Sequence, residues 1–276
     1  MDSEFRLSGE MRPRVIVSRC LTGNVCRWDG KTVRLPFLER ASEWIEFVPV
    51  CPEMEIGLGC PRSIIRLTLR RGSRNNGARS EDQVELIQPK TGRRLTGLMA
   101  EWSEQVLRSQ SPDGFLLKYK SPSCGLTNVR VYARPRGRKI LYFDSGLFAA
   151  KARQLYPRSP AIDDFRLSSP LILRHWLTGI FAIRRFRNLF EEQKNGLVLD
   201  SSEETQRRLK SFDDFYRPLL AELCPILSAR FDELIGAADI LQYFDVLLSI
   251  LNVQGRSADY RPYFPEGLDL LAGGLN

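Results

Sequence analysis

The 276 residues, 43% hydrophobic and 27% charged, have the composition of a soluble globular protein with one large domain or two ordinary ones. The net charge of +8 is unevenly placed, because residues 1–157 hold 27 Lys and Arg against 16 Asp and Glu, while the rest is slightly acidic. No apolar run approaches the roughly 20 residues that span a bilayer and no apolar signal segment opens the chain, so we expect a cytoplasmic protein with no membrane partner.

Strands alternate with helices along the first half of the chain. Apolar, mostly β-branched runs predict strands at residues 14–18, 46–50, 83–88 and 114–119. Apolar residues at helical spacing predict helices at 35–45 and 93–109. This alternation predicts an α/β domain with a Rossmann-like, mostly parallel sheet over residues 1–157.

The Gly, Asn and Arg-rich stretch 70–82 is predicted to be a loop, either a lid over a site or a solvated excursion. After residue 157 the pattern becomes helical. Ser169 is a helix cap followed by Pro170 at the first helical position, and further helices follow, which predicts an all-α domain at 158–276. That domain could recognise RNA or mediate oligomerisation, although core burial is the expected fate of apolar residues such as Phe181 and Phe186.

The chain has six cysteines and one histidine. Without a secretory signal, the cysteines are expected to be reduced thiols rather than a disulfide framework. The single histidine, His175, excludes two-histidine zinc helices and argues against triads built elsewhere in the chain. We expect His175 to pack or to lie on a helix surface.

Three thiols follow three predicted strands: Cys20, Cys51 and Cys124. Ligands bind at the carboxyl ends of the strands in open α/β sheets, so these thiols are expected to meet in one crevice. They suit an iron-sulfur cluster or a zinc ion, although buried cysteine also occurs as a small hydrophobe. A 4Fe-4S cluster usually takes four cysteines, so three would leave one iron open.

Four segments carry a family resemblance: CLTGNVCRWDG, FVPVCPEMEIGL, KYKSPSCG and DSGLFAAKARQLYP. In this order they resemble the motifs of the thiouracil desulfidase family, the TudS-like proteins, over about residues 14–157. The following stretch, AIDDFRLSSPLILRHWLTGIFAIRRFRN, is similar to the junction into the helical domain of two-domain relatives that act as tRNA 4-thiouridine desulfidases. Beyond Asn188 the similarity fades.

The resemblance implies a 4Fe-4S cluster held by Cys20, Cys51 and Cys124, with the open iron facing the sulfur of a thiocarbonyl group. Cys26 and Cys60 are interpreted as packing thiols beside the cluster, either of which could replace a ligand. Cys224 is interpreted as a core residue of the helical domain.

Replacing C=S by C=O with water requires a group that activates the water, and Glu53 is our first candidate, with Glu55 and Asp29 behind it. Two of these carboxylates also have structural interpretations, Glu53 at a helix start and Asp29 in a turn. Ser121, a further catalytic candidate, and Ser123 could hydrogen-bond a pyrimidine edge or the cluster sulfurs.

Polar residues near the cysteines are candidates for binding the rest of the substrate. Asn24 could hydrogen-bond the base, and Lys118 and Lys120 could contact a nucleotide phosphate or the leaving sulfide. Arg27 and Arg62 could contact phosphate or simply pair with Glu53 and Asp29.

The sequence thus predicts an iron-sulfur desulfidase of thiolated pyrimidine, with tRNA favoured as substrate because the N-terminal part is basic. Free thiouracil or a thiouridine nucleotide is the first alternative. The second is a non-catalytic RNA-binding protein with a structural zinc or iron-sulfur site.

Overall fold

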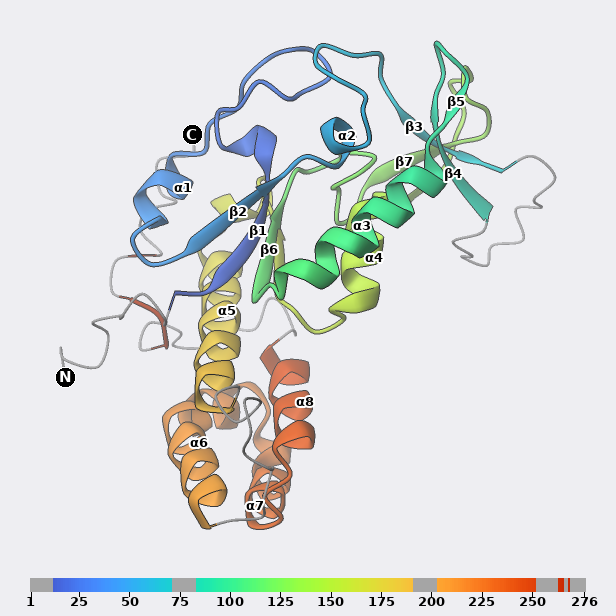
Figure 1. The fold of residues 1–276 in the computed structure, drawn as a ribbon. Coiled ribbons are helices and arrows are strands. Elements are labelled where there is room, and N and C mark those ends of the chain that lie inside the picture. Colours follow the sequence, from blue (N-terminus) through green and yellow to red (C-terminus); the bar gives the residue numbers. More distant parts are fainter. Residues whose placement is uncertain (1–11, 71–82, 191–202, 252–262, 266–267, 269–276) are drawn as a thin grey trace.

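The computed structural model describes residues 12–70, 83–190, 203–251, 263–265 and 268. Two β-sheets and the helices around them form one end of the molecule, and α5 (Pro170–Phe190) leads from the first sheet to a helical group at the other end (Figure 1). The predicted loop 70–82 lies almost wholly outside the described residues. Among the described helices, none is long and apolar enough to cross a bilayer.

The first sheet is parallel throughout and has the strand order β2-β1-β6-β9. Its strands are β1 (Arg14–Ser18), β2 (Glu46–Val50), β6 (Gly114–Leu117) and β9 (Ala161–Asp163). The first two have the predicted bounds, because short β-branched runs that end at turns are a strong strand signal. The fourth strand comes after residue 157, so the sheet includes residues from the segment assigned by sequence to the helical domain.

The second sheet is mixed, with strand order β5-β4-β3-β7-β8. It consists of β3 (Arg66–Leu69), β4 (Val84–Gln88), β5 (Arg93–Arg94), β7 (Val129–Tyr132) and β8 (Ile140–Asp144). Only the β3–β7 pair is parallel among these pairings. The placement of 83–88 in the parallel sheet was therefore wrong. Every residue of β4 is buried, and such a strand has the same continuous apolar pattern whether its neighbours are parallel or antiparallel.

Four helices accompany the sheets: α1 (Pro36–Ala41), α2 (Pro52–Glu55), α3 (Thr96–Gln110) and α4 (Leu147–Leu155). Helices α3 and α4 lie side by side on the same side of the first sheet (Figure 1). One hydrophobic cluster joins them to the sheet and includes Ile16, Phe115, Met99 and Phe148. This packing fixes the strands whose ends carry the cysteines.

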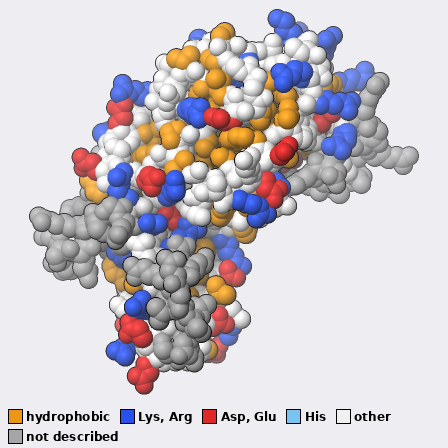
Figure 2. Space-filling view, viewed as in Figure 1, with side chains coloured by type: hydrophobic (Ala, Val, Ile, Leu, Met, Phe, Trp, Pro, Cys, Tyr) orange, Lys and Arg blue, Asp and Glu red, His pale blue; other side chains and the backbone are white. Residues whose placement is uncertain are grey.

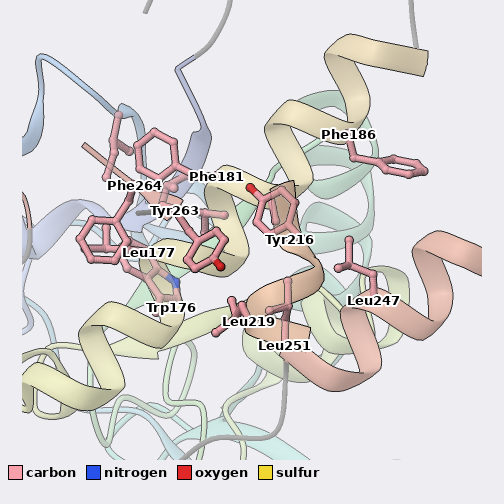
Figure 3. Close-up of a cluster of buried hydrophobic side chains, with 14 of the residues drawn as sticks. Trp176, Leu177, Phe181, Phe186, Tyr216, Leu219, Leu247, Leu251, Tyr263 and Phe264 are labelled. Atoms are coloured by element: carbon pink, nitrogen blue, oxygen red, sulfur yellow. The ribbon is translucent and has the colours of Figure 1, made fainter. Parts of the chain in front are cut away.

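A second hydrophobic cluster runs from the opposite side of the first sheet into the helical group. Helix α5 begins at Pro170, as predicted, and its Trp176 packs in the same cluster as Val15 of β1 and Leu247 of α8 (Ile240–Leu251). Figure 3 shows this cluster, with Trp176 and Phe181 on one side and Tyr216 and Leu247 on the other. The helical group therefore shares a core with the sheet.

The helical group consists of α6 (Glu203–Leu223), α7 (Ser228–Gly236) and α8 (Ile240–Leu251). Its buried Asp213 is paired: the carboxylate accepts hydrogen bonds from the Tyr243 hydroxyl at 2.8 Å and from Arg217 Nε at 2.8 Å. His175 is buried in α5, in agreement with a packing role, and Phe181 and Phe186 face the core. The expected fold class, an α/β region followed by helices, is confirmed.

Candidate active site

The three cysteines that follow predicted strands line one cavity. Cys20 lies in the 3-10 turn Arg19–Leu21 after β1, Cys51 directly follows β2, and Cys124 lies in the loop after β6. Since β1 pairs with both β2 and β6 in parallel, the three strands end at the same edge of the sheet. The cavity there has a volume of about 270 Å³.

The loop that carries Cys124 is held closely against the start of α4. Ser121 Oγ accepts hydrogen bonds from the backbone amides of Cys124 at 3.1 Å and Ser123 at 3.3 Å. Gly125 donates its amide to Ser121 O at 2.8 Å, and Gly146 donates to Gly125 O at 2.7 Å. A Cβ atom on Gly146 would lie 2.4 Å from Ser123 O, so this close approach requires glycine.

A fourth thiol, Cys26, lines the same cavity and is buried. Its hydrogen bond to Cys20 and its burial raise the pKa of the Cys26 thiol. Burial raises the pKa of Cys51 to about 12 and also raises the pKa of Cys124. Thiolates at these positions are therefore unfavourable unless a cation binds beside them, which is the condition that a metal centre supplies.

The donor set fits an iron-sulfur cluster. Within the described ranges, no three Cys, His, Asp or Glu side chains are gathered around a point where a single metal ion would bind. The ligands of a cluster bind different irons, so they lie around a cavity, as Cys20, Cys51 and Cys124 do. The site is made of thiols from three strand ends.

Glu53 is the carboxylate closest in sequence to these thiols, in the short helix α2 that starts after Cys51. Its Oε2 pairs with Arg62, at 2.8 Å from Nε and 2.7 Å from Nη2, and its Oε1 accepts a hydrogen bond from Ser123 Oγ at 3.1 Å. The Arg62 side chain is only 4% exposed and also donates to Cys26 O at 2.9 Å and Gly59 O at 2.8 Å. Glu53 is thus fixed in the cavity wall from two sides.

A family model described as 2-thiouracil desulfurase matches residues 15–164, more than half of the chain and the part that holds the cavity cysteines. The chain belongs to this family. The family expected from the sequence motifs is confirmed. A solved structure titled 4Fe-4S-dependent thiouracil desulfidase TudS matches 56% of this chain and 93% of its own, at 23% identity and a TM-score of 0.42. A comparison with curated proteins gives no match.

In this member of the 2-thiouracil desulfurase family, two basic residues that are candidates for binding substrate line the cavity, and both are paired with acidic residues. Lys118 Nζ is ion-paired with Asp164, whose Oδ1 also accepts the Tyr119 amide at 2.6 Å. Arg27 Nε lies 3.1 Å from Asp29 Oδ1. Of the two alternatives weighed for Arg27, contact with phosphate or pairing with a nearby carboxylate, an ion pair is present, and its partner is Asp29.

Other candidates are divided between the cavity wall and its surroundings. Lys120 and Ser121 line the cavity. Asn24 is exposed and donates to Thr22 Oγ1, while Ser123 is fully buried behind the wall, where it holds Glu53. Two residues outside the candidate set were missed, Trp28 and Tyr119, which line the cavity with aromatic rings.

The remaining cysteines lie outside the cavity wall. Cys60 places its sulfur 3.0 Å from Arg27 O, which suits the expected packing role. Cys224 is partly buried against the cluster shared by sheet and helices. Cys26 is different, because it faces the cavity together with the three strand-end thiols.

Proposed function

We propose that this protein is an iron-sulfur-dependent desulfidase that acts on a thiolated uridine in tRNA. The reaction exchanges C=S and water for C=O and hydrogen sulfide, and it involves no net oxidation or reduction. The observation that supports it most is the convergence of Cys20, Cys51 and Cys124 on one cavity, in a member of the 2-thiouracil desulfurase family.

In this proposal Cys20, Cys51 and Cys124 hold a 4Fe-4S cluster. Three thiolates leave one iron without a cysteine ligand, and such an iron supplies a Lewis acid with affinity for sulfur. Cys20 and Cys51 directly follow β1 and β2, and Cys124 lies in the loop after β6 that is hydrogen-bonded to the start of α4, so the backbone sets the positions of all three thiols.

Glu53 acts as the general base that takes a proton from the attacking water. Arg62 and Ser123 orient the carboxylate, since Arg62 binds Oε2 and Ser123 donates a hydrogen bond to Oε1. Ser121 lines the cavity and is proposed to hydrogen-bond the polar edge of the pyrimidine. Asp29, which is bound to Arg27, is assigned to holding that arginine at the cavity rather than to proton transfer.

The choice of tRNA rests on charge, and the size of the cavity determines how tRNA would have to bind. The excess of Lys and Arg lies in residues 1–157, and Figure 2 shows such side chains scattered around the sheet-containing part on the side drawn, among Asp and Glu side chains. A cavity of about 270 Å³ is below the roughly 300–1,000 Å³ of ordinary ligand pockets. A polynucleotide would therefore have to present one unstacked base to it.

The test is anaerobic purification with measurement of iron and acid-labile sulfide, followed by incubation with tRNA that contains 4-thiouridine and with free thiouracil. Loss of thiocarbonyl absorbance reports turnover. The proposal expects about four irons per chain and turnover of the tRNA. Turnover of free thiouracil alone would replace tRNA by a small substrate, and inactive protein with zinc or a full cluster would favour a non-catalytic RNA-binding protein.

A further inference from the structure

Two aromatic rings stack where strands β6 and β9 end. The ring centroids of Tyr119 and Phe165 are 4.9 Å apart and the ring planes differ by 17°. Their pairing follows from the sheet register, because Leu117 of β6 pairs with Asp163 of β9 and each aromatic residue lies two positions further on. Neighbouring parallel strands thus deliver both rings to the same edge as the cysteines.

This stack is exposed, unlike the aromatic pairs of the core. Phe165 is 64% exposed, and Tyr119 is partly exposed and lines the cavity. Trp28, also in the cavity wall, is 50% exposed. Large rings left in water beside a cavity indicate a binding surface, since burial of each ring would otherwise be favourable.

The stack is held in place and carries positive charge. Asp164, the residue before Phe165, accepts the Tyr119 amide at 2.6 Å and pairs with Lys118. Lys120 Nζ lies 4.8 Å from the centre of the Tyr119 ring, as a cation over an aromatic face. Rings with adjacent cations are the combination that binds bases and phosphates of unpaired nucleic acid strands.

We propose that the Tyr119–Phe165 stack is a platform for the nucleotide next to the reacting one in an RNA strand, with Lys120 near its phosphate. The cavity is small enough to exclude the neighbouring base, which must then lie at the edge, where the platform continues the stack. Identification of the reacting base rests on the proposed function, whereas binding of the strand to the platform does not.

The test compares Phe165→Ala with Phe143→Ala in the full chain. Phe143 is 55% exposed on β8 of the second sheet, so it matches Phe165 in type and exposure but not in place. The probe is a fluorescently labelled, thiol-free single-stranded uridine octamer, and anisotropy gives its Kd. We expect Phe165→Ala to weaken binding about tenfold, since one base stacked on a ring is lost. Phe143→Ala should leave the Kd unchanged.

Two further variants separate stacking from other causes. Phe165→Trp should keep the affinity, whereas Phe165→Leu should lower it as far as alanine does, because leucine is apolar but has no ring face. Lys120→Gln should lower the slope of log Kd against log salt concentration by about one, the value expected for the loss of one phosphate contact. Unchanged binding in Phe165→Ala, or full affinity in Phe165→Leu, would overturn the platform.

The outcome for the platform is independent of the outcome for catalysis. If the wild-type protein turns over neither thiolated tRNA nor thiouracil, but Phe165→Ala still weakens the octamer, the platform stands and the desulfidase proposal fails. If tRNA is turned over but the octamer has the same Kd for Phe165→Ala as for the wild type, the desulfidase proposal stands and the platform fails. If the rings instead bind an apolar surface of another protein, the octamer Kd should likewise be unchanged in Phe165→Ala.

Discussion

The cavity at the edge of the first sheet and the core of helices α5 to α8 both bury polar groups, with different results. In the helical group, buried Asp213 is bound by Tyr243 and Arg217, and large apolar side chains surround them. At the cavity, the buried pair Arg62–Glu53 lies beside a space that a ligand can enter. A buried ion pair seldom stabilises a protein more than apolar residues of equal volume. Both networks contain such a pair, so the difference lies in their surroundings: the first is enclosed by the core, whereas the second borders a cavity and is the one proposed to serve a site.

The strongest way to test this comparison is to remove one thiol from each region. Cys124→Ala is expected to abolish bound iron and desulfidase activity, since one of three strand-end ligands is lost. Cys224→Ala, in the helical group, should keep both. Iron content and thiocarbonyl absorbance after anaerobic purification provide the measurement. Equal iron in both variants would remove Cys124 from the ligand set.

The ion pair at the cavity gives the next largest effect. Arg62→Met leaves the Glu53 carboxylate buried without its charged partner, which should lower the free energy of unfolding by about 3–5 kcal/mol. Urea unfolding followed by circular dichroism measures this. Arg108→Met is the matched control, because its pair with Glu104 is exposed and should contribute less than about 1 kcal/mol. Equal losses in both variants would mean that Glu53 is as well solvated as Glu104.

A smaller side chain in the apolar core of the helices should lower the stability of the fold without changing the cavity. Leu247 is fully buried in α8, so Leu247→Ala is expected to cost about 2–5 kcal/mol of unfolding free energy. Below the unfolding transition, its iron content and turnover should match those of the wild type. Loss of iron under conditions where circular dichroism shows a folded protein would show that the helical core also shapes the cavity.

The smallest effect concerns His175. Burial lowers the pKa of its imidazole, so the unfolded chain binds the proton more readily than the folded protein does. Stability from the neutral ring is full above the unfolded pKa of about 6.5 and falls as the pH drops from there toward the lowered folded pKa, by at most about 1.4 kcal/mol per pH unit. His175→Gln should remove this part of the slope between pH 7 and 5 in urea titrations. An unchanged slope would assign the pH dependence to carboxylates.

Local patterns predicted the strands around the site well. The runs 14–18 and 46–50 have the predicted bounds because both the residue type and the turn that follows are local signals. The position of Cys20, Cys51 and Cys124 at one edge followed from the rule for parallel sheets. The second sheet was not predicted, because pairing direction depends on partners that the buried run 83–88 does not specify.

Contacts between distant residues were the harder part of the site. The pairing of Arg62 with Glu53 was one of two alternatives, since charge type alone does not identify a partner. The Tyr119–Phe165 stack was missed because it depends on the pairing of β6 with β9 across 46 residues of sequence. Tyr119 lies at the end of a predicted strand, as the three cysteines lie just after theirs, so the same rule applied to aromatic residues could have identified it.

The hydrogen bond from the Lys118 amide to Ser18 Oγ joins residues that are 100 positions apart in the chain. Contacts of such long range form slowly, because closing a long loop costs entropy before any contact forms. On the ribosome, β1 must wait for β6, and the sheet is complete only after Asp163 has emerged. Under the proposed function, the three thiols can hold a cofactor together only after β6 has paired with β1 and Cys124 has followed it.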